Sequence, residues 1–412
     1  MLLRALRHRD FRLFWSGQLV SLVGTWMQSV AQSWLVLELT NSPFRLGLVN
    51  ALQFAPMLVL SFFAGALADR LPKRRLIIAS QSVLFVQALL LAVLVHLGHV
   101  QYWHVALLAL LYGVANTVDM PSRQAFIVEL VGKDDLLNAI ALNSAMFNAA
   151  RIVGPALAGL AIARWGTAIA FYLNAVSFLA VIGALLAMRA EGLPRPRSGL
   201  TMLQDIGAGV RYAVRTPRIL LTMAMVLAVS GFLFNYNVLV PLFARDVLGL
   251  DARGFGLLMA TLGTGAVIGG VLLAALGRGR PPVAALAVPA LVLATSTAAL
   301  AAVRAVPVAA ALLLLMGFCG ILFMAGASST VQLTVPDDLR GRVMSLHTMV
   351  FAGSTPFGAF IIGSVAEAAG VTSALLVAGG GGLLSVLALL LWWNGRDRGP
   401  SLTTASPQGD PA

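Results

Sequence analysis

Arg151 is a charged residue in the middle of a long apolar run, and its position calls for a chemical explanation. An arginine at the centre of a membrane helix costs roughly 2.5–3.5 kcal/mol on insertion scales, so it normally faces a bundle interior and has a partner. It could bind substrate, couple a proton, or form a buried ion pair that holds helices together. Nearby Asn148 suggests a polar helix face, and all three roles stay open.

Polar residues share one face of a predicted helix over residues 103–127. They stand at i, i+4, i+7 and i+11 and are Tyr112, Asn116, Asp119 and Arg123. Asp119 lies in the third of this helix nearest the cytoplasm, and the family resemblance described below implies a gate-linked ion pair with Lys73 or Arg74. Pairing with Arg123, one turn along the same helix, is the alternative.

Few carboxylates are placed to carry a proton through the protein. Asp119 lies inside a predicted span, whereas Glu38, Glu129 and Glu367 lie near span ends. A carboxylate binds a proton more readily in a low-dielectric site and releases it when that site opens to water. Asp119 is the best-placed proton carrier of the four because it lies deepest in the membrane, although a cationic partner would oppose its protonation.

Neutral polar side chains interrupt several apolar runs and suggest a wet cavity. The cavity candidates are Thr25, Gln28, Gln32, Tyr112, Asn116, Asn148, Asn235 and Asn237. Hydrogen bonding between helices is the competing interpretation of the same residues.

Motifs for cofactors and metals are absent from the sequence. The Gly132-Lys133 pair is followed by Asp134, so no phosphate-binding loop of the GK[ST] kind is formed. The five histidines show no metal-ligand spacing, and the single cysteine, Cys319, excludes an intrachain disulfide. No convergent acid, base and nucleophile set suggests an enzyme. We therefore expect no cofactor, no metal and no catalytic residues.

Composition identifies the solvent that these helices need. Of the 412 residues, 59% are hydrophobic and only 11% are charged, whereas soluble domains carry about 45–50% apolar and about 25% charged residues. The sequence therefore predicts an all-α integral membrane protein, because lipid must cover this much apolar surface. Twelve transmembrane helices are expected, at 13–37, 45–68, 75–97, 103–127, 137–163, 167–188, 219–242, 254–276, 282–303, 307–332, 343–366 and 371–393.

A polar interruption at 189–218 divides these helices into two six-helix bundles, at 1–188 and 219–395. Within it, residues 200–216 have the spacing of a helix that lies on the membrane surface. Residues 396–412 are expected to form a disordered cytoplasmic tail.

Basic residues are distributed unevenly over the loops. One side of the predicted topology, with both termini, holds 22 of the 28 Lys and Arg residues, and the other side holds 5. Because basic loops stay in the cytoplasm, both termini should be cytoplasmic. The same rule accounts for the net charge of +12, so nucleic acid is not an expected partner.

The loop between the second and third spans carries the clearest motif, Gly65-Ala-Leu-Ala-Asp69-Arg70-Leu-Pro72-Lys73-Arg74. It resembles the signature of the major facilitator superfamily, with Pro72 where the last glycine is usual. The resemblance implies two six-helix bundles that rock about a central cavity. It also implies a latch in which Asp69 contacts the start of the eleventh span, near Gly341 and Arg342.

A second motif, Arg151-Ile-Val-Gly154-Pro155-Ala-Leu-Ala-Gly159, resembles the glycine-proline motif of the antiporters of that superfamily, although a single glycine replaces the usual pair. Residues 14–43 and 137–160 resemble its drug- and siderophore-exporting branch, which includes macrolide and enterobactin exporters.

These resemblances imply a multi-pass protein of the bacterial inner membrane that exports a small amphipathic molecule in exchange for protons. A monomer is expected, with a small-molecule substrate, protons and the lipid bilayer as partners. A lipid transporter of the same fold, a membrane-embedded lipid enzyme and a non-transporting sensor are the alternatives.

Overall fold

The structure is a computed structural model that describes residues 3–192, 202–276, 279 and 281–397. Residues 398–412 of the predicted tail and residues 193–201 of the linker therefore lie outside the described residues. Within the described ranges every regular element is helical. The first group comprises η1 (Arg4–Arg7), α1 (Arg9–Thr40), α2 (Pro43–Arg70), α3 (Lys73–His96), α4 (Tyr102–Val131), α5 (Leu136–Trp165) and α6 (Ala168–Ala187).

The remaining elements are α7 (Met202–Arg215), α8 (Pro217–Phe232), α9 (Tyr236–Leu242), the π-helical turn η2 (Phe243–Val247), α10 (Ala252–Leu276), α11 (Ala284–Ala299), η3 (Leu300–Ala302), α12 (Val306–Thr334) and α13 (Asp337–Asp397). In the described residues, ten helical segments are long and apolar enough to cross a membrane. Helices suit this setting because they satisfy their own backbone hydrogen bonds in lipid.

Helix boundaries fall within a few residues of the expected spans, because turn residues end the apolar runs. Ser42 caps α2 by accepting a hydrogen bond from the Arg45 amide at 3.2 Å. Gly370, with φ of +82°, interrupts α13 between the two spans expected there.

The predicted span at 219–242 lies within one stretch that is long and apolar enough to cross a membrane, Pro217–Val247, but it is not one continuous helix. α8 ends at Phe232 and α9 begins at Tyr236. The Asn235 side chain donates to the Gly231 carbonyl at 2.8 Å, so it replaces a helical backbone bond at the break. Broken helices are tolerated in membranes where they are covered by protein or line a cavity.

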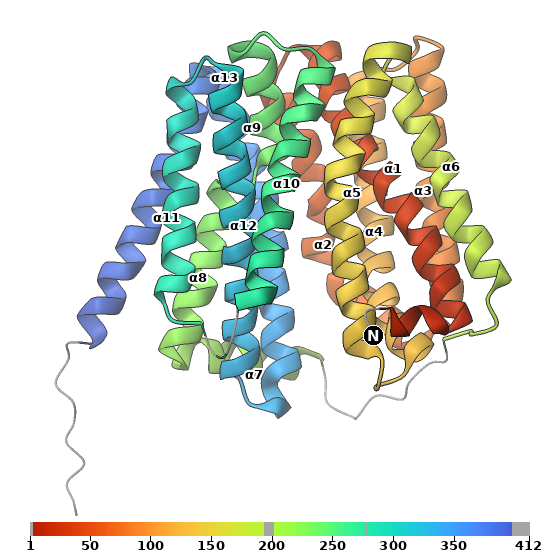
Figure 1. The fold of residues 1–412 in the computed structure, drawn as a ribbon, viewed down its shortest axis with the longest axis vertical. Coiled ribbons are helices and arrows are strands. Elements are labelled where there is room, and N and C mark those ends of the chain that lie inside the picture. Colours follow the sequence, from red (N-terminus) through yellow and green to blue (C-terminus); the bar gives the residue numbers. More distant parts are fainter. Residues whose placement is uncertain (1–2, 193–201, 277–278, 280, 398–412) are drawn as a thin grey trace, which may run out of the picture.

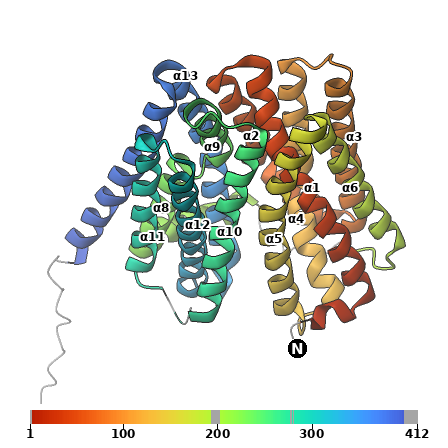
Figure 2. The same ribbon diagram turned by 45° about the horizontal axis from the view of Figure 1, so that its top comes forward.

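The helices lie in two groups, α1–α6 and α8–α13 (Figures 1 and 2). Pairs α2–α13 and α5–α10 make the main contacts between the groups. We call the end of the helices opposite the chain's N-terminus the far end; α1 runs toward it and α2 starts there (Figure 1).

Candidate functional site

Arg151 lies in α5 where this helix packs on α10, because a Cβ on Gly263 of α10 would come within 2.7 Å of the Arg151 carbonyl oxygen. The guanidinium carbon lies 5.9 Å from the centre of the Trp26 ring of α1. Tyr236 of α9 is close enough to interact electrostatically. Among the described residues no carboxylate contacts Arg151, so the buried ion pair considered from sequence is not formed there.

Asp119 is buried in a network inside the first helix group. It forms an ion pair with Arg123 at 2.5 Å and accepts hydrogen bonds from the Ser80 hydroxyl at 2.7 Å and the Gln81 amide at 3.0 Å. Arg123 also donates to the side chain of Gln18. The i, i+4 pairing is therefore confirmed, and the expected pairing with Lys73 or Arg74 is wrong.

Lys73 instead pairs with Glu129 of α4 at 2.9 Å, although its long side chain is almost fully buried. Its backbone amide donates to the Gly192 carbonyl at 2.9 Å, and the Arg74 guanidinium donates to the Leu186 carbonyl at 3.1 Å. The start of α3 is thus bound to the last turn of α6 and to the chain that follows it, which sequence spacing alone did not reveal.

The other residues of the predicted latch are only partly described. Arg70 is exposed, and Arg342 is half-buried with its Cβ against Gly209 of α7. The surroundings of Gly65 and the side chain of Asp69 are not described, so the latch stays a prediction.

The glycines of the second motif lie at helix contacts. A Cβ on Gly159 would come within 3.0 Å of the Ala252 carbonyl of α10, and one on Gly154 would come within 2.9 Å of the Val23 carbonyl of α1. Pro155 places its carbonyl oxygen against Gly256, where an added Cβ would lie 2.5 Å away. Because glycine has no side chain, α5 can approach α1 and α10 closely at these positions.

Two cavity candidates are buried and bonded between helices. Gln28 donates to Gln87 at 3.0 Å and accepts from Asn174 at 2.6 Å. Gln32 donates to Gln53 at 2.8 Å. These bonds favour the helix-packing interpretation for Gln28 and Gln32. The partners are polar residues on other helices, which the sequence shows. It does not show which of them pair, because pairing depends on how each helix is rotated about its axis.

The remaining cavity candidates differ in their surroundings. Those that are half-buried are Thr25, Tyr112, Asn116, Asn148 and Asn237. The Asn148 amide donates to the Ser144 carbonyl within its own helix at 2.8 Å. Asn235 is buried, and its side-chain oxygen has no hydrogen-bond partner among the described residues.

Hydrogen bonds join the two helix groups at the far end. Glu367 of α13 accepts from the Ser42 hydroxyl at 2.8 Å and the Phe44 amide at 3.1 Å. Ser33 donates to the Asn237 carbonyl at 3.1 Å, and Arg245 donates to the Leu37 carbonyl at 3.1 Å. Close backbone contact accompanies them, since a Cβ on Gly47 would come within 3.0 Å of the Gly363 Cα. The far end is therefore closed in this structure.

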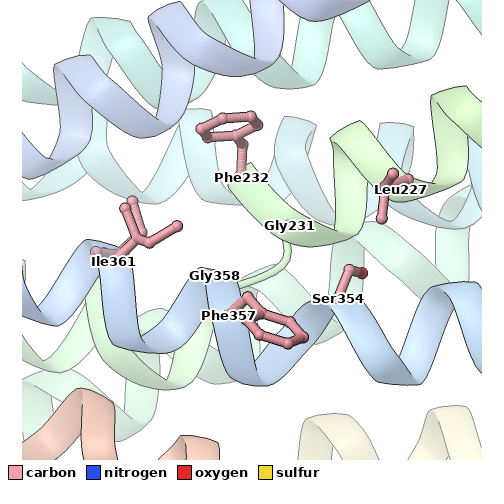
Figure 3. A pocket seen from close by; sticks show the side chains of 8 residues that line it. Leu227, Gly231, Phe232, Ser354, Phe357, Gly358 and Ile361 are labelled. Atoms are coloured by element: carbon pink, nitrogen blue, oxygen red, sulfur yellow. The ribbon is translucent and has the colours of Figure 1, made fainter. Parts of the chain in front are cut away.

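An apolar pocket of about 220 Å³ lies between α8 and α13, beside the helix break (Figure 3). Its lining includes Leu227, Phe232, Phe357 and Ile361. Ser354 supplies a hydroxyl, which already bonds to Ser230 at 2.5 Å. This pocket holds no charged group, so it can accommodate only an apolar part of a ligand.

Apolar helices in two groups, with polar and charged residues buried inside them and a broken helix at their contact, are typical of membrane transporters. The family model described as "Transmembrane secretion effector" matches residues 2–396. The chain therefore belongs to this family of the major facilitator superfamily, and it is a multi-pass transporter and not an enzyme.

Curated relatives agree with this assignment. The chain is 29% identical to the multidrug efflux pump Tap of Mycolicibacterium fortuitum, over 86% of this chain and 88% of that protein. It is 28% identical to the staphyloferrin A transporter of Staphylococcus aureus, over 64% and 66% of the two chains. It is 21% identical to macrolide efflux protein A of Streptococcus pyogenes, over 89% and 92%.

Solved structures share the fold at low sequence identity. A nucleoside transporter, NupG, superimposes with a TM-score of 0.75 at 13% identity, over 95% of this chain and 99% of that one. A peptide transporter, POT, gives 0.74 at 14% identity, over 94% of each chain.

Proposed function

We propose that this protein exports a small amphipathic molecule, a drug, siderophore or metabolite, in exchange for protons. The observation that carries the proposal is the likeness to multidrug efflux pump Tap over 86% of the chain. The absence of a nucleotide-binding motif from the sequence supports an ion or solute gradient as the energy source.

The transport cycle would be alternating access between two six-helix bundles, residues 1–188 and 219–395, joined by the linker at 189–218. Twelve crossings result if α1 joins the ten candidate spans and α13 crosses twice, on either side of Gly370. Closure at the far end suits the state in which substrate enters from the other end. The latch at Asp69 would hold that other end shut in the opposite state.

Acids for proton exchange are already engaged with neighbours. Asp119 is in the buried network, and Glu129 pairs with Lys73. Glu367 joins the two helix groups, while Glu38 of α1 accepts from the Thr167 hydroxyl at the start of α6 at 3.3 Å. Because protonation weakens such bonds, proton binding at any of these acids would loosen a helix contact.

Exchange with protons is tested in liposomes that contain the purified protein and a panel of dyes and antibiotics. An acidic liposome interior should drive substrate uptake by protein molecules that are inserted with their cytoplasmic side outward. Each transported substrate should also cause proton movement across the membrane. Protein-free liposomes are the control. Undiminished transport after the pH gradient and membrane potential are both collapsed, or a requirement for sodium, would contradict proton coupling.

Topology is tested with single cysteines in a Cys319→Ala background. Lys133 and His99 are exposed residues in loops at opposite ends of the helices. In intact cells, an impermeant maleimide should label His99→Cys, whereas Lys133→Cys should require permeabilised cells. Equal labelling of both from outside would refute cytoplasmic termini.

A further inference from the structure

Arg151 brings a positive charge into the membrane without a compensating acid among the described residues. The guanidinium lies over the Trp26 ring, and Trp26 in turn contacts Phe147 at 5.8 Å between ring centres. Ring stacking leaves the in-plane N–H donors of an arginine available. No hydrogen bond from these donors to a described residue is formed, so the arginine can still bind an anion.

Tyr236 of α9, in the second helix group, is close enough to Arg151 for the two side chains to interact electrostatically. Tyr236 is 8% exposed, and its hydroxyl has no hydrogen-bond partner among the described residues. Helix α12 packs against Tyr236, since a Cβ on Gly320 of α12 would lie 3.4 Å from the Tyr236 hydroxyl oxygen. A buried hydroxyl normally has a partner, so this one is suited to donate to a ligand.

Aromatic rings continue the surface beyond Tyr236. The Phe234 ring centre lies 5.7 Å from that of Tyr236 and 6.0 Å from that of Phe351 in α13. A cationic group is thus flanked by rings from both helix groups. This arrangement suits a ligand that carries an anionic group on a flat apolar body.

We propose that the exported substrates are aromatic or similarly flat amphipathic anions, whose carboxylate binds between the Arg151 guanidinium and the Tyr236 hydroxyl. The inference rests on the proposed export function and specifies its substrate class. Arginine binds a carboxylate through two parallel N–H bonds, and the tyrosine hydroxyl donates a third. Because Arg151 and Tyr236 belong to different helix groups, the bound anion would join the two groups.

The test uses aromatic carboxylic acids, each compared with its neutral carboxamide. Binding is measured by isothermal titration calorimetry on the full-length protein in nanodiscs, with empty nanodiscs subtracted. Wild-type protein should bind the acids more tightly than the amides. Tyr236→Phe should weaken acid binding about tenfold, since it removes a hydrogen bond to a charged group, and should change amide binding much less.

Arg151→Gln should abolish the preference for acids. Tyr172→Phe in α6 and Arg164→Gln at the exposed end of α5 are matched controls and should bind like wild type. If Arg151→Gln does not fold, the Tyr236→Phe variant and the comparison of acids with amides still test whether a carboxylate binds at this place. Equal binding of acids and amides, no binding of any acid, or unchanged acid binding by Tyr236→Phe would overturn the inference. Export of the neutral amides would then leave the proposed export function intact.

Discussion

Replacing Asp119 by alanine should destabilise the protein by roughly 3–5 kcal/mol, because it leaves the Arg123 charge buried without its partner. The same change removes the acceptor for Ser80 and Gln81. Transport should be lost with it, since this network ties α3 and α4 to α1 through Gln18. Thermal unfolding of the purified protein and export from liposomes measure the two effects.

A double variant separates charge from packing at the same place. Asp119→Asn with Arg123→Gln removes both charges and should recover much of the lost stability, because neither ion is then buried alone. Asp135→Ala, which removes a partly exposed pair with His8, is the surface control and should cost at most about 1 kcal/mol. Wild-type stability and export by Asp119→Ala would show that the network is dispensable.

Replacing Gly256 by leucine should prevent closure at the far end and reduce export. An added Cβ would lie 2.5 Å from the Pro155 carbonyl oxygen and 2.9 Å from the Gly159 Cα, so α10 could no longer approach α5. Overpacking costs about 1–3 kcal/mol, which corresponds to roughly a 5- to 150-fold shift between closed and open states.

Labelling of a cysteine at the far-end contact reports that shift directly. Ser33 is buried beside Asn237, so Ser33→Cys should react slowly in the wild-type background and faster with Gly256→Leu. Gly270→Leu is the matched control, because the nearest atom to its added Cβ would be Ile321 at 4.0 Å. Unchanged labelling and export in Gly256→Leu would mean that α5 and α10 need not approach each other.

Helix positions followed closely from the sequence, whereas partners across helices did not. A run of apolar residues long enough to span lipid determines a helix locally, and Gly370 marks a turn by its own chemistry. Asp119 and Arg123 were likewise predictable as a pair, because one turn of one helix separates them.

Contacts such as Lys73–Glu129 and Gln28–Asn174 depend on how helices rotate about their axes. In helices that are apolar on every side, the hydrophobic pattern gives little information on that rotation. The break before Tyr236 was visible only as three polar residues in an apolar run. Its backbone geometry depends on packing against α13, where Gly358 allows the Gly231 carbonyl to come close.

Glycine-to-backbone contacts at the far end also affect the thermodynamics of opening and closing. At Gly47–Gly363 and Gly159–Gly256, main-chain atoms meet without intervening side chains. Burial of a long side chain costs up to about 1.5–2 kcal/mol of rotamer entropy, whereas glycine has none to lose. Closure at these contacts therefore immobilises few rotamers, and the two access states can remain close in free energy over a wide range of temperature.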